Sequence, residues 1–78
     1  MTIEFCDRTG FIFAEVYKEN GVVYLFTGSD MVLENVSQLR DFIRTVRDDA
    51  WVSVDGIDYV RINDDNRWNL AEKLWDLI

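Results

Sequence analysis

The residues that most often perform enzymatic chemistry are scarce in this 78-residue chain. It contains no histidine, which is the commonest general base and neutral metal ligand, and a single cysteine, Cys6. Glu4 and Asp7 lie close to Cys6 in the sequence, and nearby negative charge raises the pKa of a thiol, so we expect Cys6 to be unreactive. The four glycines fall at predicted turns or strand ends and form no phosphate-binding loop.

Acidic side chains are the other candidates for chemistry. With 15 aspartates and glutamates in the chain, some must lie close together by chance, so proximity alone is weak evidence for acid–base catalysis. The polar run 63–66 offers oxygen ligands but lacks the central glycine and the distal glutamate of a calcium loop, and helix capping explains it better. We therefore expect no enzymatic activity, no metal site and no cofactor.

The charge balance constrains the partner. A net charge of −7 opposes contact with phosphate backbones and anionic membranes, so we expect a protein partner with a basic or neutral surface, and neither direct nucleic-acid nor membrane binding. The alternative is that acidic charge only keeps a small protein soluble. The lone thiol, and the lack of a signal-like or membrane-spanning apolar run, predict a cytoplasmic location.

The chain is predicted to form a single domain, residues 1–78. Strand-like patterning dominates its first third. Apolar and polar residues alternate over 2–6, 11–19 and 22–27. The first two segments are separated by a turn at 7–10, and Asn20-Gly21, a strong type I′ hairpin signal, separates the second and third.

A helix, a second hairpin and a final helix follow. Asn35 and Gln38 form a capping-box pattern before a helix that should end near Asp48-Asp49. Strands are predicted at 51–54 and 57–62 around Asp55-Gly56. The polar run 63–66 then precedes the last helix. The apolar stripe of the first helix comprises Val36, Leu39, Phe42, Ile43 and Val46, and that of the last comprises Trp68, Ala71, Leu74, Trp75 and Ile78.

This order, βββαββα, predicts an α+β fold: an antiparallel sheet, made of a β-meander and a second hairpin, with both helices packed on one face. Pairing across Asn20-Gly21 separates the residues of the two sheet faces. The face predicted to hold the helices is aliphatic: Ile12, Ala14, Val16, Val23 and Leu25, joined by Ile3 and Phe5. The opposite face is aromatic and acidic: Phe11, Phe13, Glu15, Tyr17, Glu19, Val22, Tyr24 and Phe26, with Glu4 and Cys6 nearby.

The aromatic and acidic face is the predicted binding site, because aromatic residues are enriched at protein-binding hot spots. Its candidate partner-binding residues are Glu4, Phe13, Glu15, Tyr17, Glu19, Tyr24 and Phe26. Acidic groups on a small scaffold can imitate spaced phosphates and block a basic surface. In size and charge alone, the chain is similar to phage-type inhibitors (anti-CRISPR proteins and nucleic-acid mimics) and to bacterial immunity proteins or antitoxins. We therefore expect a non-enzymatic inhibitor of a partner protein.

Two alternatives remain open. The aromatic face could instead be covered within the protein or by a second copy, which would make the chain a self-associating structural or adaptor subunit, for example a homodimer. Separately, Arg40, Arg44 and Arg47 follow one side of the first predicted helix. They form either a small basic stripe or a solvated face paired with local carboxylates such as Asp41 and Asp48.

Overall fold

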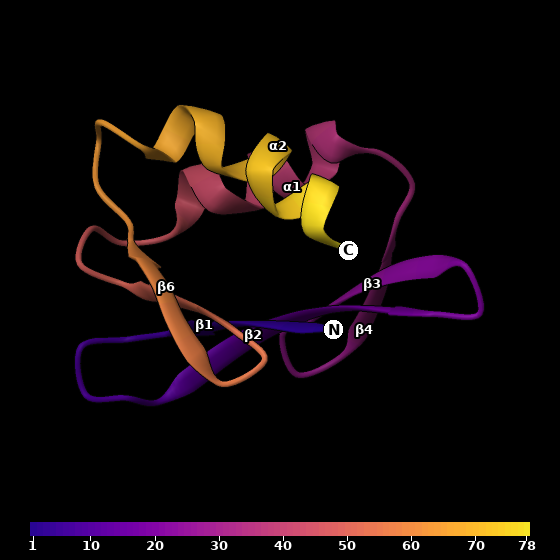
Figure 1. The fold of residues 1–78 in the computed structure, drawn as a ribbon, viewed down its shortest axis with the longest axis horizontal. Helices are drawn as coiled ribbons and strands as arrows, with labels where there is room; N and C mark the ends of the chain where they lie inside the picture. Colours follow the sequence, from indigo (N-terminus) through magenta and orange to yellow (C-terminus); the bar gives the residue numbers. More distant parts are fainter.

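Six strands form one antiparallel sheet, and both helices cover the same side of it (Figure 1). The computed structural model describes residues 1–78. In space the strands follow the order β4-β3-β2-β1-β5-β6, so hairpins between sequence neighbours build most of the sheet and the β1–β5 pairing joins its two parts. The strands are β1 (Thr2–Cys6), β2 (Ile12–Glu19), β3 (Val22–Phe26), β4 (Asp30–Leu33), β5 (Trp51–Val54) and β6 (Ile57–Arg61). The predicted α+β architecture is confirmed.

One strand was not predicted. Residues 30–33 form β4, which pairs with β3 at the sheet edge and makes the order ββββαββα. Met31 and Val32 are both about half exposed and only Leu33 is buried, so the segment carries no two-residue hydrophobic alternation. The connection from β3 includes Gly28 at a φ of 100°, a left-handed conformation that glycine adopts without strain.

The two predicted tight turns have the geometry expected of type I′ hairpins. Asn20 and Gly21 have φ angles of 52° and 80°, and Asp55 and Gly56 have 52° and 81°. Glycine and asparagine or aspartate tolerate positive φ better than other residues, which is why these pairs fix the hairpin positions. The register Val16↔Leu25 and Tyr17↔Tyr24 follows, as predicted.

A β-bulge changes the predicted faces at the start of β2. Phe5 pairs with Ala14 but Cys6 pairs with Ile12, so Phe13 is an extra residue between two ladder pairs. Phe13 therefore turns to the helix side and packs against the core, while Ile12 is 42% exposed. The predicted positions of Ile12 and Phe13 are both wrong, because strict alternation does not hold across a bulge.

Helix α1 (Val36–Thr45) begins at the predicted cap. The Asn35 side chain accepts a hydrogen bond from the Gln38 backbone N–H at 3.3 Å, and Gln38 Oε1 accepts one from the backbone N–H of Glu34. The helix ends earlier than predicted, because Val46 is already extended, with a ψ of 138°. Its apolar stripe is confirmed: Leu39, Ile43 and Val46 are buried, and Val36 and Phe42 pack against the core.

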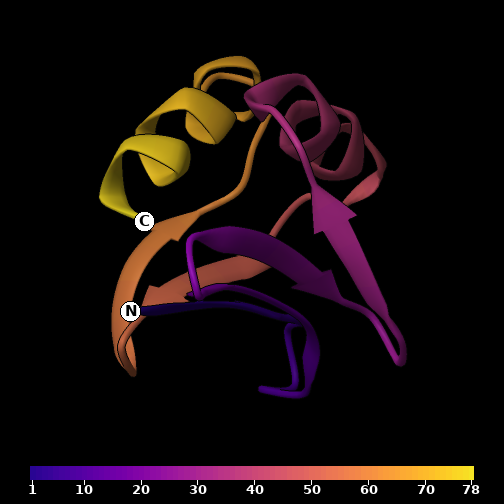
Figure 2. The ribbon, with the colours of Figure 1, turned by 90° about the vertical axis from the view of Figure 1, so that its right-hand side faces the viewer.

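Helix α2 (Arg67–Leu77) packs beside α1 above the sheet (Figure 2). Ala71 and Leu74 are buried as predicted, and Trp75 and Ile78 pack at the edge of the core. The prediction for Trp68 is wrong: it is 54% exposed, and the Arg44 guanidinium lies 5.5 Å from its ring centre. Leu70 takes the buried position instead, so the apolar side of α2 is rotated from the predicted one.

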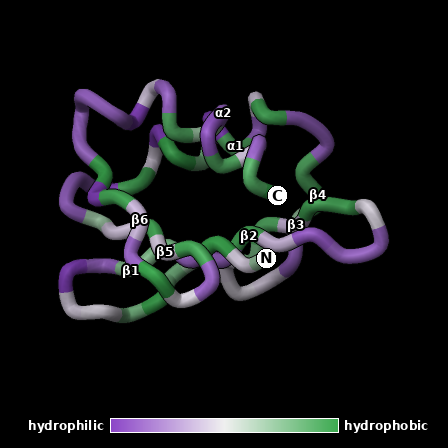
Figure 3. Tube along the Cα trace, viewed as in Figure 1, coloured by the Kyte–Doolittle hydropathy of each residue, from purple (hydrophilic) through white to green (hydrophobic).

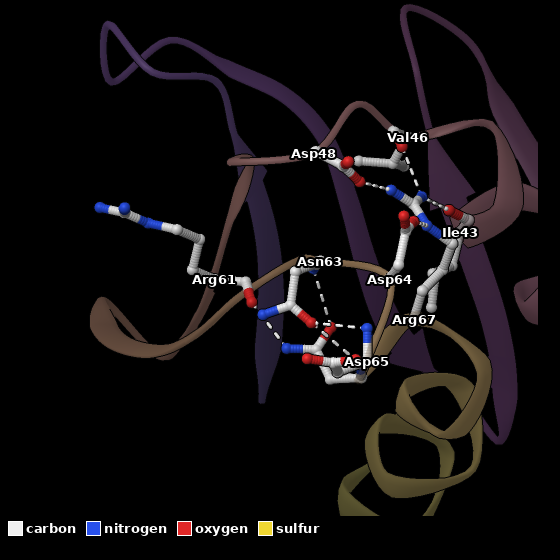
Figure 4. Close-up of polar contacts among 9 residues, drawn as sticks. Ile43, Val46, Asp48, Arg61, Asn63, Asp64, Asp65 and Arg67 are labelled. Atoms are coloured by element: carbon white, nitrogen blue, oxygen red, sulfur yellow. Dashed lines mark hydrogen bonds and ion pairs between the residues drawn. The ribbon is translucent and has the colours of Figure 1, made fainter.

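A buried arginine links the start of α2 to the end of α1 (Figure 4). Arg67 Nη1 donates hydrogen bonds to the carbonyl oxygens of Ile43 and Val46, at 2.7 and 2.5 Å, and its other terminal nitrogen pairs with Asp48. These carbonyls lie at the C-terminal end of α1, where backbone acceptors are short of partners. The Ile43 carbonyl also accepts from the Val46 backbone N–H at 3.2 Å, whereas Arg67 is the donor to Val46. Arg67 thus caps α1 from the first turn of α2.

The polar run before α2 is a hydrogen-bonded turn (Figure 4). Asn63 Oδ1 accepts from the backbone N–H groups of Asp65 and Asn66, and Asn66 Nδ2 donates to the carbonyl oxygen of Arg61. The capping contact itself differs from the prediction, because the Asn66 side chain makes no hydrogen bond into α2.

Hydrophobic residues gather along the strands and hydrophilic residues in the loops around the rim (Figure 3). The core lies between the sheet and the helices and includes Ile3, Phe5, Ala14, Val16, Val23 and Leu25, all predicted there. Neither helix combines the length and the apolar character required to cross a bilayer.

Candidate partner-binding surface

The sheet side facing away from the helices is the candidate binding surface, here called the outer face. In Figure 2 the sheet curves toward the helices at both edges, β4 and β6, so the outer face is convex. Strand pairing and alternation define its members: Thr2, Glu4, Cys6, Ile12, Glu15, Tyr17, Glu19, Val22, Tyr24, Phe26, Asp30, Val32, Trp51, Ser53, Asp58 and Arg61.

One line of paired residues crosses all six strands of the outer face. It runs Asp30–Phe26–Glu15–Glu4–Ser53–Asp58, one residue from each strand in spatial order, and is called the transverse row. Four of its six members are carboxylates. Neighbouring strands lie about 5 Å apart. The row therefore places Glu4 and Glu15 on adjacent strands and Asp30 and Asp58 two strands further out on either side.

The carboxylates of the transverse row have no basic partners. The ion pairs of the protein join Arg40 to Glu72, Arg44 to Asp41, and Arg67 to Asp48 and Asp64, all away from the outer face. Within the row, the Ser53 hydroxyl donates to Asp58 at 3.2 Å, which orients that carboxylate without neutralising it. Glu4 and Glu15 face each other directly. Like charges in that position destabilise a sheet, so folding alone does not explain the arrangement.

Aromatic side chains lie on β2 and β3, both in the row and beside it. Tyr17 and Tyr24 stack with ring centres 5.3 Å apart, and the Tyr17 hydroxyl donates to Asp30 Oδ1 at 2.8 Å. That hydrogen bond to a carboxylate raises the pKa of Tyr17 to about 12. Phe26, in the row itself, is 40% exposed. The face thus combines fixed aromatic rings with unpaired carboxylates.

The β5–β6 end of the face has a different character. The Arg61 guanidinium lies 4.2 Å from the ring centre of Trp51, a cation–π contact that covers the indole. Cys6 lies beside Trp51 in the ladder. Burial, and then the charge of Glu4, raise the pKa of the Cys6 thiol, in agreement with the predicted lack of reactivity.

Six of the seven predicted site residues come together on the outer face: Glu4, Glu15, Tyr17, Glu19, Tyr24 and Phe26. Phe13 does not, because the bulge turns it to the core. Sequence reasoning missed Asp30 and Asp58, which complete the transverse row. The position of Asp58 on the outer face could have been predicted from the second hairpin by pairing β5 with β1. The position of Asp30 could have been predicted only by recognising β4, for which the turn at Gly28 is the available signal.

The chain matches no known family model, no curated protein and no solved structure. What the outer face binds must therefore be inferred from its residues.

Proposed function

We propose that this protein binds a basic surface of a partner protein through its outer face and thereby blocks that surface. The single observation that supports the proposal most is the transverse row, four carboxylates on one convex face with no basic partner. A folded protein gains nothing from facing Glu4 with Glu15. A basic partner would turn that repulsion into attraction and would associate quickly.

The chemistry and curvature of the outer face favour a nucleic-acid-binding partner. A line of negative charges resembles a phosphate backbone, and a convex face fits a concave groove of the kind that holds a nucleic acid. Tyr24 and Phe26 would add apolar contact area next to the charges. The proposed activity is thus inhibition by occupation of a nucleic-acid site, which is the chemistry of nucleic-acid mimics, anti-CRISPR proteins and antitoxins.

Self-association through the outer face is the weaker alternative. A twofold dimer on this face would place the transverse row of one copy against that of the other and bring eight carboxylates together. Arg61 cannot neutralise them, because it lies at one end of the face and stacks on Trp51. Sedimentation at micromolar concentration tests the point, and the proposal requires a monomer.

Two charge-matched variants test the proposed function. The first changes the four carboxylates of the transverse row to amides: Glu4→Gln, Glu15→Gln, Asp30→Asn and Asp58→Asn. The control removes the same four charges from exposed sites off the outer face: Glu34→Gln, Asp49→Asn, Asp65→Asn and Asp76→Asn.

Immobilised wild-type protein and the control should retain the same basic proteins from a lysate of the source organism, and salt should elute them. The row variant should retain none of them. Equal retention by both variants would show that the carboxylates of the transverse row are not responsible for binding.

A further inference from the structure

A second concave site lies away from the outer face, between the β1–β2 loop and the C-terminal end of α1. It is a half-open cleft of about 910 Å³, lined by residues 7–9 of the loop, the first residues of β2, the last turn of α1 and the segment leading into β5. This volume is within the range of about 300–1,000 Å³ typical of small-molecule sites.

The deeper wall of the cleft is apolar and rigid. Phe13 and Phe42 line it, and both rings contact the buried ring of Phe5, at centre distances of 6.4 and 5.2 Å. The core therefore holds both aromatic walls in place. Phe11 lines the outer part of the cleft and is 65% exposed. The bulge that moves Phe13 to the helix side is what creates this wall.

Two carboxylates line the cleft, and each is already engaged within the protein. Asp7 Oδ1 accepts hydrogen bonds from the Thr9 hydroxyl at 2.6 Å and from the backbone N–H groups of Thr9 and Phe11, at 2.9 and 3.0 Å. Asp48 pairs with the buried guanidinium of Arg67. Asp48 is thus paired with a cation, whereas the hydrogen bonds to Asp7 orient its carboxylate without neutralising it.

Two arginines line the same cleft and are not engaged. The guanidinium groups of Arg8 and Arg47 form no ion pair and no hydrogen bond within the protein, in contrast to Arg40, Arg44 and Arg67. In a chain of net charge −7, two unpaired guanidinium groups beside one aromatic wall are a specific local feature. A guanidinium group binds carboxylates and phosphates with well-directed N–H donors.

We propose that this cleft binds a small organic anion: an aromatic or branched aliphatic body against Phe13 and Phe42, with its carboxylate or similar group between Arg8 and Arg47. The volume is large enough to accommodate such a molecule, and the apolar wall with few polar groups is the usual composition of a ligand site. A peptide rich in acidic residues fits less well, because the net charge of the protein repels each additional negative charge.

The test is an NMR titration of the full chain with 3-phenylpropionate, using 3-phenylpropanol as the neutral analogue of the same shape. Amide shift changes should concentrate at residues 7–13, 42–50 and Thr27. The neutral analogue should bind about tenfold more weakly, because it lacks the charge-assisted hydrogen bonds.

Variants make the assignment specific. Arg8→Gln combined with Arg47→Gln should weaken 3-phenylpropionate about tenfold, and Arg44→Gln, in the last turn of α1 but outside the cleft, should leave the affinity unchanged. The proposal is overturned if shifts map elsewhere, if the neutral analogue binds equally well, or if Arg44→Gln has the same effect as the double variant. It is also overturned if a phenylalanine–aspartate peptide binds the cleft much more tightly than 3-phenylpropionate does.

Discussion

Glu4 on β1 and Glu15 on β2 are direct cross-strand partners on the outer face, and neither forms an ion pair with a basic residue. Such a pair lowers the stability of the sheet. Residues that weaken a fold in this way are commonly kept because function needs them. The pair therefore links the stability of the protein to its proposed function.

Substitution of Glu15→Lys should make the protein more stable and less able to bind. The new lysine would face Glu4, and the free energy of unfolding should rise by about 0.5–1 kcal/mol, as measured by urea denaturation. The control is Glu34→Lys, which makes the same charge change at an exposed site off the outer face. The gain should shrink in high salt, because exposed charges are screened. An equal gain from both substitutions would mean that only net charge matters.

The hydrogen bond from Tyr17 to Asp30 predicts a distinct high-pH titration. Because the pKa of Tyr17 is raised to about 12 in the folded protein, from an ordinary value near 10, its contribution to stability is complete below about pH 10. That contribution is lost as the pH rises through about 12. Ultraviolet absorbance, compared with that of Tyr17→Phe, isolates the ionisation of Tyr17, and Asp30→Asn should lower the pKa of Tyr17. Ionisation of Tyr17 near pH 10 in the wild-type protein would contradict this contact.

Phe13 and Phe26 should respond in opposite ways to truncation. Phe13 packs against Phe5 and the core, so Phe13→Ala should lower the free energy of unfolding by about 2–3 kcal/mol. Phe26 is 40% exposed on the outer face, so Phe26→Ala should cost less than about 1 kcal/mol while weakening partner binding. Denaturation curves of the two variants give the comparison directly. The reverse order of stability losses would place Phe13 on the outer face and remove the bulge.

Arg67 should be the arginine on which stability depends most. Arg67→Ala leaves the Val46 carbonyl oxygen without its donor, removes one of the two donors to the Ile43 carbonyl oxygen, and should cost about 3 kcal/mol in urea denaturation. Arg67→Lys should recover only part of that, since one ammonium group cannot reproduce the planar fork. Arg44 is exposed, and Arg44→Ala should cost less than about 1 kcal/mol. Equal losses at the two positions would rule out the capping role.

Most of the fold followed from local signals in the sequence. Asn20-Gly21 and Asp55-Gly56 fixed two hairpins because few other residue pairs tolerate positive φ twice in succession, and Asn35 fixed the start of α1. The parts that did not follow depend on contacts between distant segments. The end of α1 depends on Arg67, which lies 21 residues after Val46.

The candidate surface was predictable where alternation is regular. Glu15, Tyr17 and Tyr24 lie where the hairpin register placed them. Phe13 does not, because a bulge leaves no reliable signal in a single sequence. Asp30 was missed because β4 is an edge strand with little buried surface. The transverse row and its unpaired charges can be recognised only when the pairing of all six strands is known.

Competition with nucleic acid tests the central claim most directly. Basic proteins from the source organism would be bound to immobilised duplex DNA, and the wild-type protein, the row variant and the charge-matched control would each be added at equal concentration. We predict that the wild-type protein and the control release the same partner from the DNA and that the row variant releases nothing. Release by the row variant equal to that by the control, or no release by the wild-type protein, would contradict the account.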